Sequence, residues 1–463
     1  MHIFSKNRMS LLYLAGAAAL IMGFSLASGA NAATSGDWPT YLSNKSRTGF
    51  NGAEKLITRS TAPSLRPLWT DSSGPVSAEP VQVNGTVYYG SWDGYEHAVD
   101  AATGTQLWST YLGQTTKATC NPPSVGVAST ATVGNITVNG ISTQAVFVGG
   151  GDHNFYALNA ATGAVIWKTA LGTTSSTFLW SSPLFHRGII YEGVSSFGDC
   201  PLIRSKIVAI RATTGSIRHT LYTAPSDCTG ASVWGSPAVD TSTGDIYFGT
   251  GNGSTTCMEP LSVAVIQASS SLSLLSSWQI PAADHGPDSD FGSTPTLFTS
   301  GGTPMVGIQN KNGVYYAFDR SSLSSGPAWR TKVSIAGECP ECGMGNISSS
   351  AWDGSQLYVA GGNTTINGVK CPGSVQALQP GTGNVAWRTC LQGGPVLGAV
   401  TAVPGVVFLG QGTYFTAIDT STGNTLFSYQ DTNPGSNFWG PASISNGVAY
   451  IGNQDGTLFA FGS

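Results

Sequence analysis

Between residues 199 and 311 the sequence places polar and aromatic side chains at the ends of predicted β-strands, where they could hold a cofactor or a metal. Ser232 and Trp234 precede one such strand in "CTGASVWGSPAVD", and Asn252 follows the next strand in "YFGTGNGS". Asp288 and Asp290 precede a later strand in "DSDFGSTPTLF". An indole ring offers a flat apolar surface, whereas carboxylates can accept protons or bind a hard cation.

Two further charged residues fit the same set. Lys311 occupies a turn in "IQNKNGVYYAFDR", and Asp199 lies in a loop within "SSFGDCPLIRSK". A Lys beside an electron acceptor would stabilise the negative charge that develops on reduction. Each residue also has an ordinary structural explanation: Trp234 could pack between sheets, Asn252 could fill a turn, and the charged groups could be solvated or cap a strand.

A sequence repeat indicates which elements must position these residues. Its copies include "HAVDAATGTQLW" ending at Trp108, "YALNAATGAVIW" ending at Trp167 and "VQALQPGTGNVAW" ending at Trp387. Each copy reads as a strand, a turn with Gly and a second strand, and the Trp can cover the adjoining unit. Another hairpin lies upstream of each copy, so every unit holds four strands (a, b, c and d), which is typical of a β-propeller.

The two ends of the repeat region predict how the ring closes. Leu68 and Trp69 look like an isolated strand d, while the C-terminal run from Gly440 to Ser463 supplies strands a, b and c without a d. We therefore expect an all-β, eight-bladed β-propeller with four-stranded blades, whose last blade is closed by an N-terminal strand.

Propeller topology then sorts the loops by face. Because neighbouring strands are antiparallel, the segments before strand a and the b–c loops open on one face, and the a–b and c–d turns open on the other. All of the candidate residues fall on the first face, in three neighbouring blades. We expect them to converge on one mouth near the propeller axis.

The N-terminus and the composition narrow the class of protein. Lys6 and Arg8, an apolar run from about Leu11 to Ala27 and the small residues Ala30 and Ala32 predict a secretory signal peptide over residues 1–32, with an uncleaved membrane anchor as the alternative. Residues 33–463 are then expected to form a single propeller in a secreted or periplasmic protein. The net charge of −4 gives no basic patch for nucleic acid, and no later segment is apolar enough to cross a membrane.

Eight cysteines in an exported chain favour disulfides. Proximity in the sequence predicts the pairs Cys228–Cys257, Cys371–Cys390 and Cys339–Cys342. The last pair, in "CPEC", could instead be half of a zinc site or a redox motif, but no second ligand pair follows it. We interpret it as a loop staple.

The repeat resembles that of the quinoprotein propellers, whose blades carry the motif Ala-x-Asp-x-x-Thr-Gly-x-x-x-Trp, and "DWPTYLSNKSRTGF" is similar to the first segment of such proteins. In style the chain is closest to the polyvinyl-alcohol-dehydrogenase-like and other alcohol dehydrogenases that use pyrroloquinoline quinone (PQQ), without a haem domain. The resemblance implies that Trp234 stacks on the quinone with Ser232 in a Thr position, and that Lys311 bonds the quinone.

The same resemblance implies a calcium ion and a base. Asn252 in "GTGN" matches a calcium ligand, and Asp199 stands as a shorter substitute for a calcium-binding Glu. Either Asp288 or Asp290 matches the catalytic base, and the alignment leaves open which. The chain departs from the family's dehydrogenases in having no adjacent Cys-Cys pair.

Two functions from different classes remain open. One is PQQ-dependent oxidation of a small or polymeric alcohol, with electrons passed to an external acceptor such as a cytochrome. The other is a non-catalytic propeller that acts as a binding or assembly scaffold. The missing Cys-Cys pair favours the scaffold, whereas the set of Trp234, Asn252 and Lys311 favours the enzyme.

Overall fold

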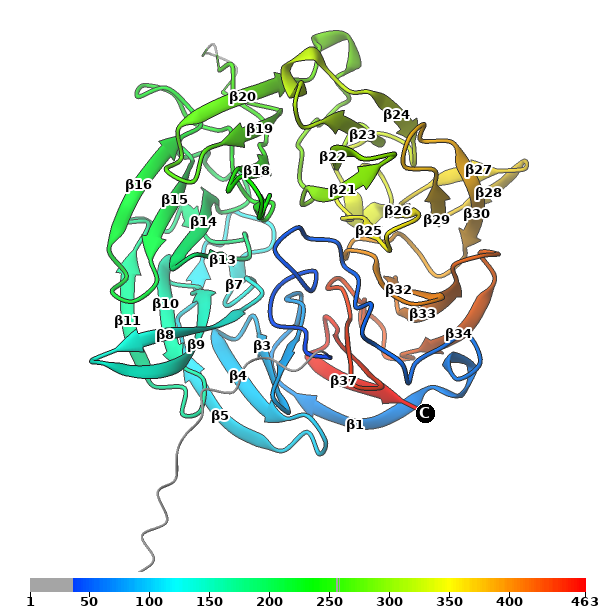
Figure 1. The fold of residues 1–463 in the computed structure, drawn as a ribbon, viewed down its shortest axis with the longest axis horizontal. Coiled ribbons are helices and arrows are strands. Elements are labelled where there is room, and N and C mark those ends of the chain that lie inside the picture. The colour runs from blue at the N-terminus through cyan, green and yellow to red at the C-terminus, as the bar shows by residue number, and fades with distance from the viewer. Residues whose placement is uncertain (1–35, 255–256, 258) are drawn as a thin grey trace, which may run out of the picture.

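The computed structural model describes residues 36–463 except 255, 256 and 258, so the predicted signal peptide lies outside the described residues. The fold is an all-β propeller of eight four-stranded blades arranged around a central axis (Figure 1), as the repeat predicts. Among the described residues the helical elements are four short 3-10 turns, η1 (Ala62–Ser64), η2 (Ala282–Asp284), η3 (Leu323–Ser325) and η4 (Pro340–Cys342). No helix within this part of the chain is long and apolar enough to span a membrane.

The blades follow one another along the chain, each with its strands in the order a to d from the axis outward. Blade 1 contains β2 (Val81–Val83), β3 (Thr86–Gly90), β4 (Tyr95–Asp100) and β5 (Gln106–Tyr111). Blade 2 contains β8 (Thr132–Val138), β9 (Ile141–Gly149), β10 (Asn154–Asn159) and β11 (Val165–Ala170). Blade 3 contains β13 (Leu184–His186), β14 (Ile189–Ser196), β15 (Lys206–Arg211) and β16 (Ile217–Tyr222), and blade 4 contains β17 (Ala238–Val239), β18 (Ile246–Gly249), β19 (Ala264–Ala268) and β20 (Leu274–Gln279).

The second half of the ring repeats this arrangement. Blade 5 contains β21 (Thr296–Ser300), β22 (Thr303–Asn310), β23 (Val314–Asp319) and β24 (Trp329–Lys332). Blade 6 contains β25 (Ala351–Trp352), β26 (Leu357–Gly361), β29 (Gly373–Leu378) and β30 (Val385–Leu391), and blade 7 contains β31 (Thr401–Val403), β32 (Val406–Gln411), β33 (Tyr414–Asp419) and β34 (Thr425–Gln430). The loops contain five shorter strands: β6 (Thr115–Thr116), β7 (Ser124–Val125), β12 (Thr177–Phe178), β27 (Thr364–Ile366) and β28 (Val369–Cys371).

Blade 8 joins the two ends of the described chain. Its strands a, b and c are β35 (Ser443–Ser445), β36 (Val448–Gly452) and β37 (Thr457–Gly462), and its strand d is β1 (Arg66–Ser72). Trp69 pairs with Ala460, and Asp71 pairs with Leu458. The predicted closure by the N-terminal strand is therefore confirmed, and every blade has four strands.

The repeated Trp residues hold neighbouring blades together. The indole N–H of Trp108 in blade 1 donates to the carbonyl of Ala160 in blade 2 at 2.9 Å, and Trp167 in blade 2 donates to Ala212 in blade 3 at 2.9 Å. A Cβ on Gly163, whose φ is +70°, would lie 2.6 Å from the ring of Trp108. The turn Gly thus provides both the left-handed backbone and the space for the indole. Equivalent bonds link three more seams through Trp69, Trp329 and Trp387.

An axial segment, residues 36–65, crosses the centre of the ring (Figure 1). It forms backbone hydrogen bonds with the first strands of several blades, for example from Val239 to Lys45, from Leu297 to Ser46 and from Ala402 to Gly49. Its own Trp38 is completely buried. The axial segment therefore fills the channel beneath the mouth and connects blades that do not touch one another.

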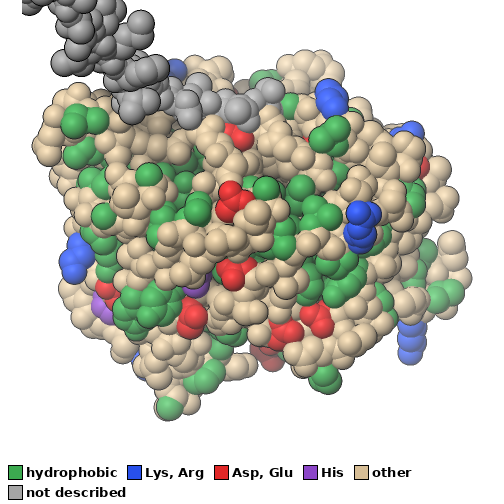
Figure 2. All heavy atoms as spheres, turned by 90° about the horizontal axis from the view of Figure 1, so that it is seen from below, with side chains coloured by type: hydrophobic (Ala, Val, Ile, Leu, Met, Phe, Trp, Pro, Cys, Tyr) green, Lys and Arg blue, Asp and Glu red, His purple; other side chains and the backbone are tan. Residues whose placement is uncertain are grey.

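The outer surface carries few charges. On the side shown in Figure 2, acidic and basic side chains lie scattered among hydrophobic and uncharged ones. This matches the low charged fraction of the sequence, 10%.

Candidate functional site

The predicted mouth exists as a cavity of about 600 Å³ at the propeller axis. Its lining includes six of the seven candidate residues: Asp199, Ser232, Trp234, Asp288, Asp290 and Lys311. The seventh, Asn252, is hydrogen-bonded to two of them. One cavity thus contains candidate residues that lie more than a hundred positions apart in the sequence.

Lys311, Asp288, Asp290 and Asn252 form one hydrogen-bonded cluster. Lys311 Nζ donates to Asp288 Oδ2 at 2.7 Å and to Asp290 Oδ2 at 3.2 Å. Asn252 donates from Nδ2 to Asp288 Oδ1 at 2.8 Å and from its backbone N–H to Asp290 Oδ1 at 2.6 Å. All four carboxylate oxygens of the aspartate pair therefore accept from these two residues.

Local backbone bonds hold this cluster in register. The b–c loop of blade 4 carries Asn252, whose carbonyl accepts from the N–H of Ala231, while Gly251 donates to the carbonyl of Ser232 at 2.9 Å. In blade 5 the N–H of Lys311 donates to the carbonyl of Asp290 at 3.0 Å. Asn252 is thus held against the segment before strand a of blade 4, and Lys311 is held against the segment before strand a of blade 5.

Trp234 lies against glycine on one side. A Cβ on Gly292 would lie 2.1 Å from Cη2 of Trp234, so only Gly leaves room for the indole in this position. Lys311 Nζ lies 5.3 Å from the centre of the Trp234 ring, within reach of a cation–π interaction. The half-buried indole is therefore fixed beside the charged cluster and still borders the cavity.

Ser232 and Asp199 differ in their surroundings. The Ser232 hydroxyl lies within hydrogen-bond distance of the Ser196 and Ser205 hydroxyls, 3.3 and 3.2 Å away. Asp199 is exposed to the mouth, has a φ of +54° and forms no ion pair with any described residue. Ser232 therefore helps to pack the loops, whereas Asp199 is free to take up a ligand.

Burial and charge perturb the acid–base groups of the cluster. Burial, with Asp288 and Asp199 adding to it, raises the pKa of Asp290 to about 6, although Lys311 and the Asn252 N–H oppose the rise. Burial alone would lower the pKa of Lys311, but Asp290 and Asp288 more than offset this and raise it. Partial burial, with Asp288 adding to it, raises the pKa of Asp199, and Lys311 opposes the rise. Lys311 therefore stays charged, and Asp290 can change its protonation state near neutral pH.

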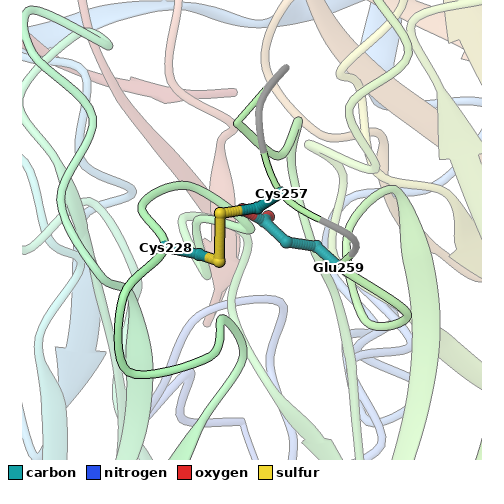
Figure 3. Close-up of side chains that lie close together, drawn as sticks. All are labelled: Cys228, Cys257 and Glu259. Atoms are coloured by element: carbon teal, nitrogen blue, oxygen red, sulfur yellow. A yellow bond between two sulfur atoms is a disulfide. The ribbon is translucent and has the colours of Figure 1, made fainter.

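A disulfide and a buried carboxyl group, both shown in Figure 3, lie next to the loop that follows Asn252. Cys228 bonds to Cys257, and Glu259 lies beside the disulfide. Glu259 Oε1 accepts from the N–H of Ser254 at 3.1 Å. Because Gly230 and Gly253 also form a β-bridge, the segment before Ser232 and the loop after Asn252 are tied together.

The three predicted disulfides are confirmed, namely Cys228–Cys257, Cys339–Cys342 and Cys371–Cys390. The fourth, Cys120–Cys200, was not predicted, because its partners are 80 residues apart in the loops of two blades. Its neighbours Asn121 and Asp199 line the mouth. Two groups of close Cys and Glu side chains among the described residues each contain a disulfide, which leaves their sulfur atoms unable to act as thiolate ligands.

Two rings of side chains surround the cavity, and sequence reasoning missed both. The upper ring comes from the residue four positions before each strand a, in blade order Ser77, Ala128, Trp180, Trp234, Gly292, Ile347, Leu397 and Trp439. The lower ring comes from the residue two positions before each strand a, in blade order Glu79, Thr130, Ser182, Ser236, Thr294, Ser349, Ala399 and Pro441, of which all but Glu79 line the cavity. The recurring stretches "WSSP", "WGSP" and "WGPA" were the available signal.

The residues present fit a planar quinone better than a calcium ion. The cavity has the size of a ligand pocket, Trp234 offers an aromatic face, and Lys311 offers a cation. Calcium takes six to eight oxygen ligands. Asp199 and the amide oxygen of Asn252 are hard donors of the right type, but all oxygens of Asp288 and Asp290 already accept from Lys311 and Asn252.

Comparisons with known proteins place this fold among quinoproteins. A model of the PQQ_2 family, described as outer membrane protein assembly factor BamB, matches residues 53–286 and 310–462. A polyvinylalcohol dehydrogenase from Pseudomonas sp is 24% identical over 429 residues, which cover 81% of this chain and 64% of that protein. A quinohemoprotein alcohol dehydrogenase from Comamonas testosteroni is 27% identical over 263 residues, which cover 49% of this chain and 35% of that protein. This chain thus spans less than two thirds of either relative.

Solved structures with the same fold include a dehydrogenase and an assembly factor. A quinohemoprotein alcohol dehydrogenase from Comamonas testosteroni superimposes with a TM-score of 0.72 at 18% identity, over 94% of this chain and 81% of that one. BamB from Moraxella catarrhalis superimposes with a TM-score of 0.57 at 12% identity, over 86% of this chain and 100% of that one. At these identities the likeness concerns the fold alone.

Proposed function

The chain belongs to the PQQ_2 family, and we propose that this member is a PQQ-dependent alcohol dehydrogenase that works outside the cytoplasm. The observation that carries the proposal is the cluster of Lys311, Asp288, Asp290 and Asn252 beside Trp234, inside a single axial cavity. A scaffold needs no largely buried Lys that bridges two carboxylates in the lining of a cavity, because burying such charges is costly.

In the proposed reaction the residues divide the work. When bound, PQQ would supply a hydride acceptor, and a calcium ion would supply a Lewis acid. Trp234 provides the flat surface for the ring system, and Lys311 places its charge where negative charge develops. Asp199 and Asn252 would supply oxygen ligands to the calcium ion.

We assign the base to Asp288 rather than Asp290. Its side chain is 14% exposed, against 7% for Asp290, and it accepts from two side-chain donors, Lys311 and Asn252, that can rotate away. Asp290 instead anchors the backbone N–H of Asn252 at 2.6 Å. Asp288 accepts the hydroxyl proton of the alcohol, while Asp290 holds the backbone of Asn252 in place.

The proposal also covers the location of the protein, its substrate and its electron acceptor. Four disulfides suit an oxidising compartment, so we propose that the protein is secreted or periplasmic. Its substrate is a small or polymeric alcohol, and its electrons pass to an external acceptor such as a cytochrome. The rival function, a binding or assembly scaffold, is favoured by the absence of an adjacent Cys-Cys pair in the sequence.

The decisive test is reconstitution of the purified protein with PQQ and calcium. We expect a bound-quinone absorption spectrum and reduction of an artificial dye by primary, secondary or polymeric alcohols. Asp288→Asn should keep the spectrum and lower turnover by roughly 10²-fold or more, because the base is lost and the shape is kept. Trp234→Ala should weaken PQQ binding itself. A protein that binds no PQQ would support the scaffold instead.

A further inference from the structure

The lower ring of the mouth contains five hydroxyl groups in succession, from Thr130 in blade 2 to Ser349 in blade 6. Each hydroxyl oxygen accepts a backbone N–H from the preceding blade: Glu79 donates to Thr130 at 2.8 Å, Thr130 to Ser182 at 3.0 Å, Ser182 to Ser236 at 2.9 Å, Ser236 to Thr294 at 3.1 Å and Thr294 to Ser349 at 2.8 Å. All five side chains are at least 95% buried and line the cavity.

The hydrogen atoms of three of these five hydroxyls are available to a ligand. The oxygens already accept, so each hydroxyl has a donor left over. Thr294 and Ser349 direct theirs toward the hydroxyl of Tyr41 in the axial segment. Thr130, Ser182 and Ser236 donate to no acceptor among the described residues. The floor of the cavity therefore presents buried donors, and Tyr41 borders the same space.

A buried cation lies directly beneath this floor. Arg47 is completely buried, and its guanidinium donates to the carbonyls of Tyr41, Ser182, Pro183 and Pro237 and to the hydroxyl of Thr40. It forms no ion pair with any described residue, although buried charges are normally paired. Its charge is therefore unbalanced at contact distance.

The two carboxyl groups whose charge would act on Arg47, Glu79 and Glu192, are themselves perturbed by burial. Burial raises the pKa of Glu79 to about 8, against the effects of the Leu42 N–H and Arg47, and burial raises the pKa of Glu192 well above its ordinary value. Burial therefore disfavours the charged form of both groups. The positive charge of Arg47 remains below the ring of donors.

We propose that the floor of the mouth is a carboxylate-binding subsite, in which Thr130, Ser182 and Ser236 donate to the anion and Arg47 balances its charge. The fold itself does not require these hydroxyls, because blades 7 and 8 place Ala399 and Pro441 at the same position. Their concentration on one arc above Arg47 therefore points to a ligand. The inference does not depend on the proposed function.

A carboxylate at this subsite could belong to either of two molecules. It could be one of the carboxylates of PQQ itself, or it could be a free carboxylic acid that shares the mouth. The chemistry of recognition is the same in both cases, so the experiment must separate them.

The first arm of the test compares acetate with its neutral isostere acetamide at matched ionic strength. A ligand that binds only the folded protein raises the melting temperature in a saturable way. We expect this behaviour for acetate and none for acetamide. If neither compound, or both equally, stabilises the protein, the floor is simply a water-filled polar cavity and the proposal is wrong.

Variants locate the effect without removing Arg47, whose loss could prevent folding. The double change Ser182→Ala and Ser236→Ala removes two donors and should weaken acetate binding about tenfold or more. Ser236→Thr is the matched control, because Thr130 and Thr294 show that Thr serves in this ring. Unchanged acetate binding in the double variant would overturn the proposal.

The second arm identifies the source and keeps the two proposals apart. If the subsite holds a carboxylate of PQQ, acetate should compete with PQQ, and the trimethyl ester of PQQ should bind at least about tenfold more weakly. If it holds a free acid, the ester and PQQ should bind alike while acetate still binds. Acetate binding that depends on the ring in a protein that takes up no PQQ would uphold the subsite and refute the dehydrogenase.

Discussion

At the seam between blades 2 and 3, Trp167 packs in the hydrophobic cluster shared by those blades and donates its indole N–H to Ala212 at 2.9 Å. At the mouth, Trp234 lies on Gly292, borders the cavity and faces Lys311. The first residue belongs to a repeat, and the second occupies a position that differs from blade to blade. The comparison teaches that repeated residues build this molecule, and that departures from the repeat give one face its chemistry.

The largest expected effect comes from a truncation that prevents blade 8 from forming and so leaves the ring open. Removal of residues 457–463 deletes β37, so β1 loses its partner and blade 8 cannot form. We expect loss of the cooperative thermal transition and of soluble protein, even though every residue of the mouth cluster remains in the chain. Removal of Ser463 alone, which lies outside β37, is the control. A truncated protein with the normal melting temperature would show that the mouth does not need the ring.

Single substitutions should separate the two roles of tryptophan. Trp167→Ala removes a packed indole and its hydrogen bond, which should lower the free energy of unfolding by roughly 3 kcal/mol. Trp234→Ala should cost less than about 1 kcal/mol, because its ring is half-buried and borders a cavity. Denaturant unfolding measures both. Equal losses of stability would contradict the division between seam and mouth.

The mouth should also give the stability a pH dependence. The pKa of Asp290 rises from an ordinary 3.8 to about 6 in the folded protein, chiefly through burial. Between these values the folded state holds a proton that the unfolded state has lost. The stability contributed by this group is therefore full below about pH 4 and is lost as the pH rises through 6, a change of roughly 3 kcal/mol at most.

Asp290→Asn should flatten the fall in melting temperature between about pH 4 and 6, because the amide does not titrate. Asp455→Asn, on the exposed surface of blade 8, should leave that fall unchanged. A variant at position 290 with the same pH profile as the natural protein would assign the dependence to other groups.

The sequence specified the seams well because their signals are local and repeated. Trp108 and Gly163, for example, each appear in a copy of the same motif, and the motif alone gave the strands, the turns and the closure of the ring by Trp69. The gathering of Asp288, Lys311 and Asn252 was also predictable, since it follows from which loops share a face.

Other features of the site depend on side-chain directions and on contacts across the axis. The inward turn of Arg47 and the pairing of Cys120 with Cys200 involve segments that meet only when the ring is complete. Ser232 contacts the hydroxyls of Ser196 and Ser205 at the edge of the cavity, and its position in the chain could not reveal these contacts. The upper and lower rings were visible as spacings before each strand a, but only the folded blades show that these positions meet.

The pairing of β1 with β37 also constrains when the molecule can become a ring. Nearly the whole chain separates the two partners, so their contact has a very high sequence separation and forms slowly. Until β37 has been synthesised, β1 has no partner, and the growing propeller exposes unpaired strand edges of the kind that promote aggregation. Protection of those edges during synthesis is thus a demand that this closure places on the cell, and completion of the ring is the step at which the mouth acquires its floor.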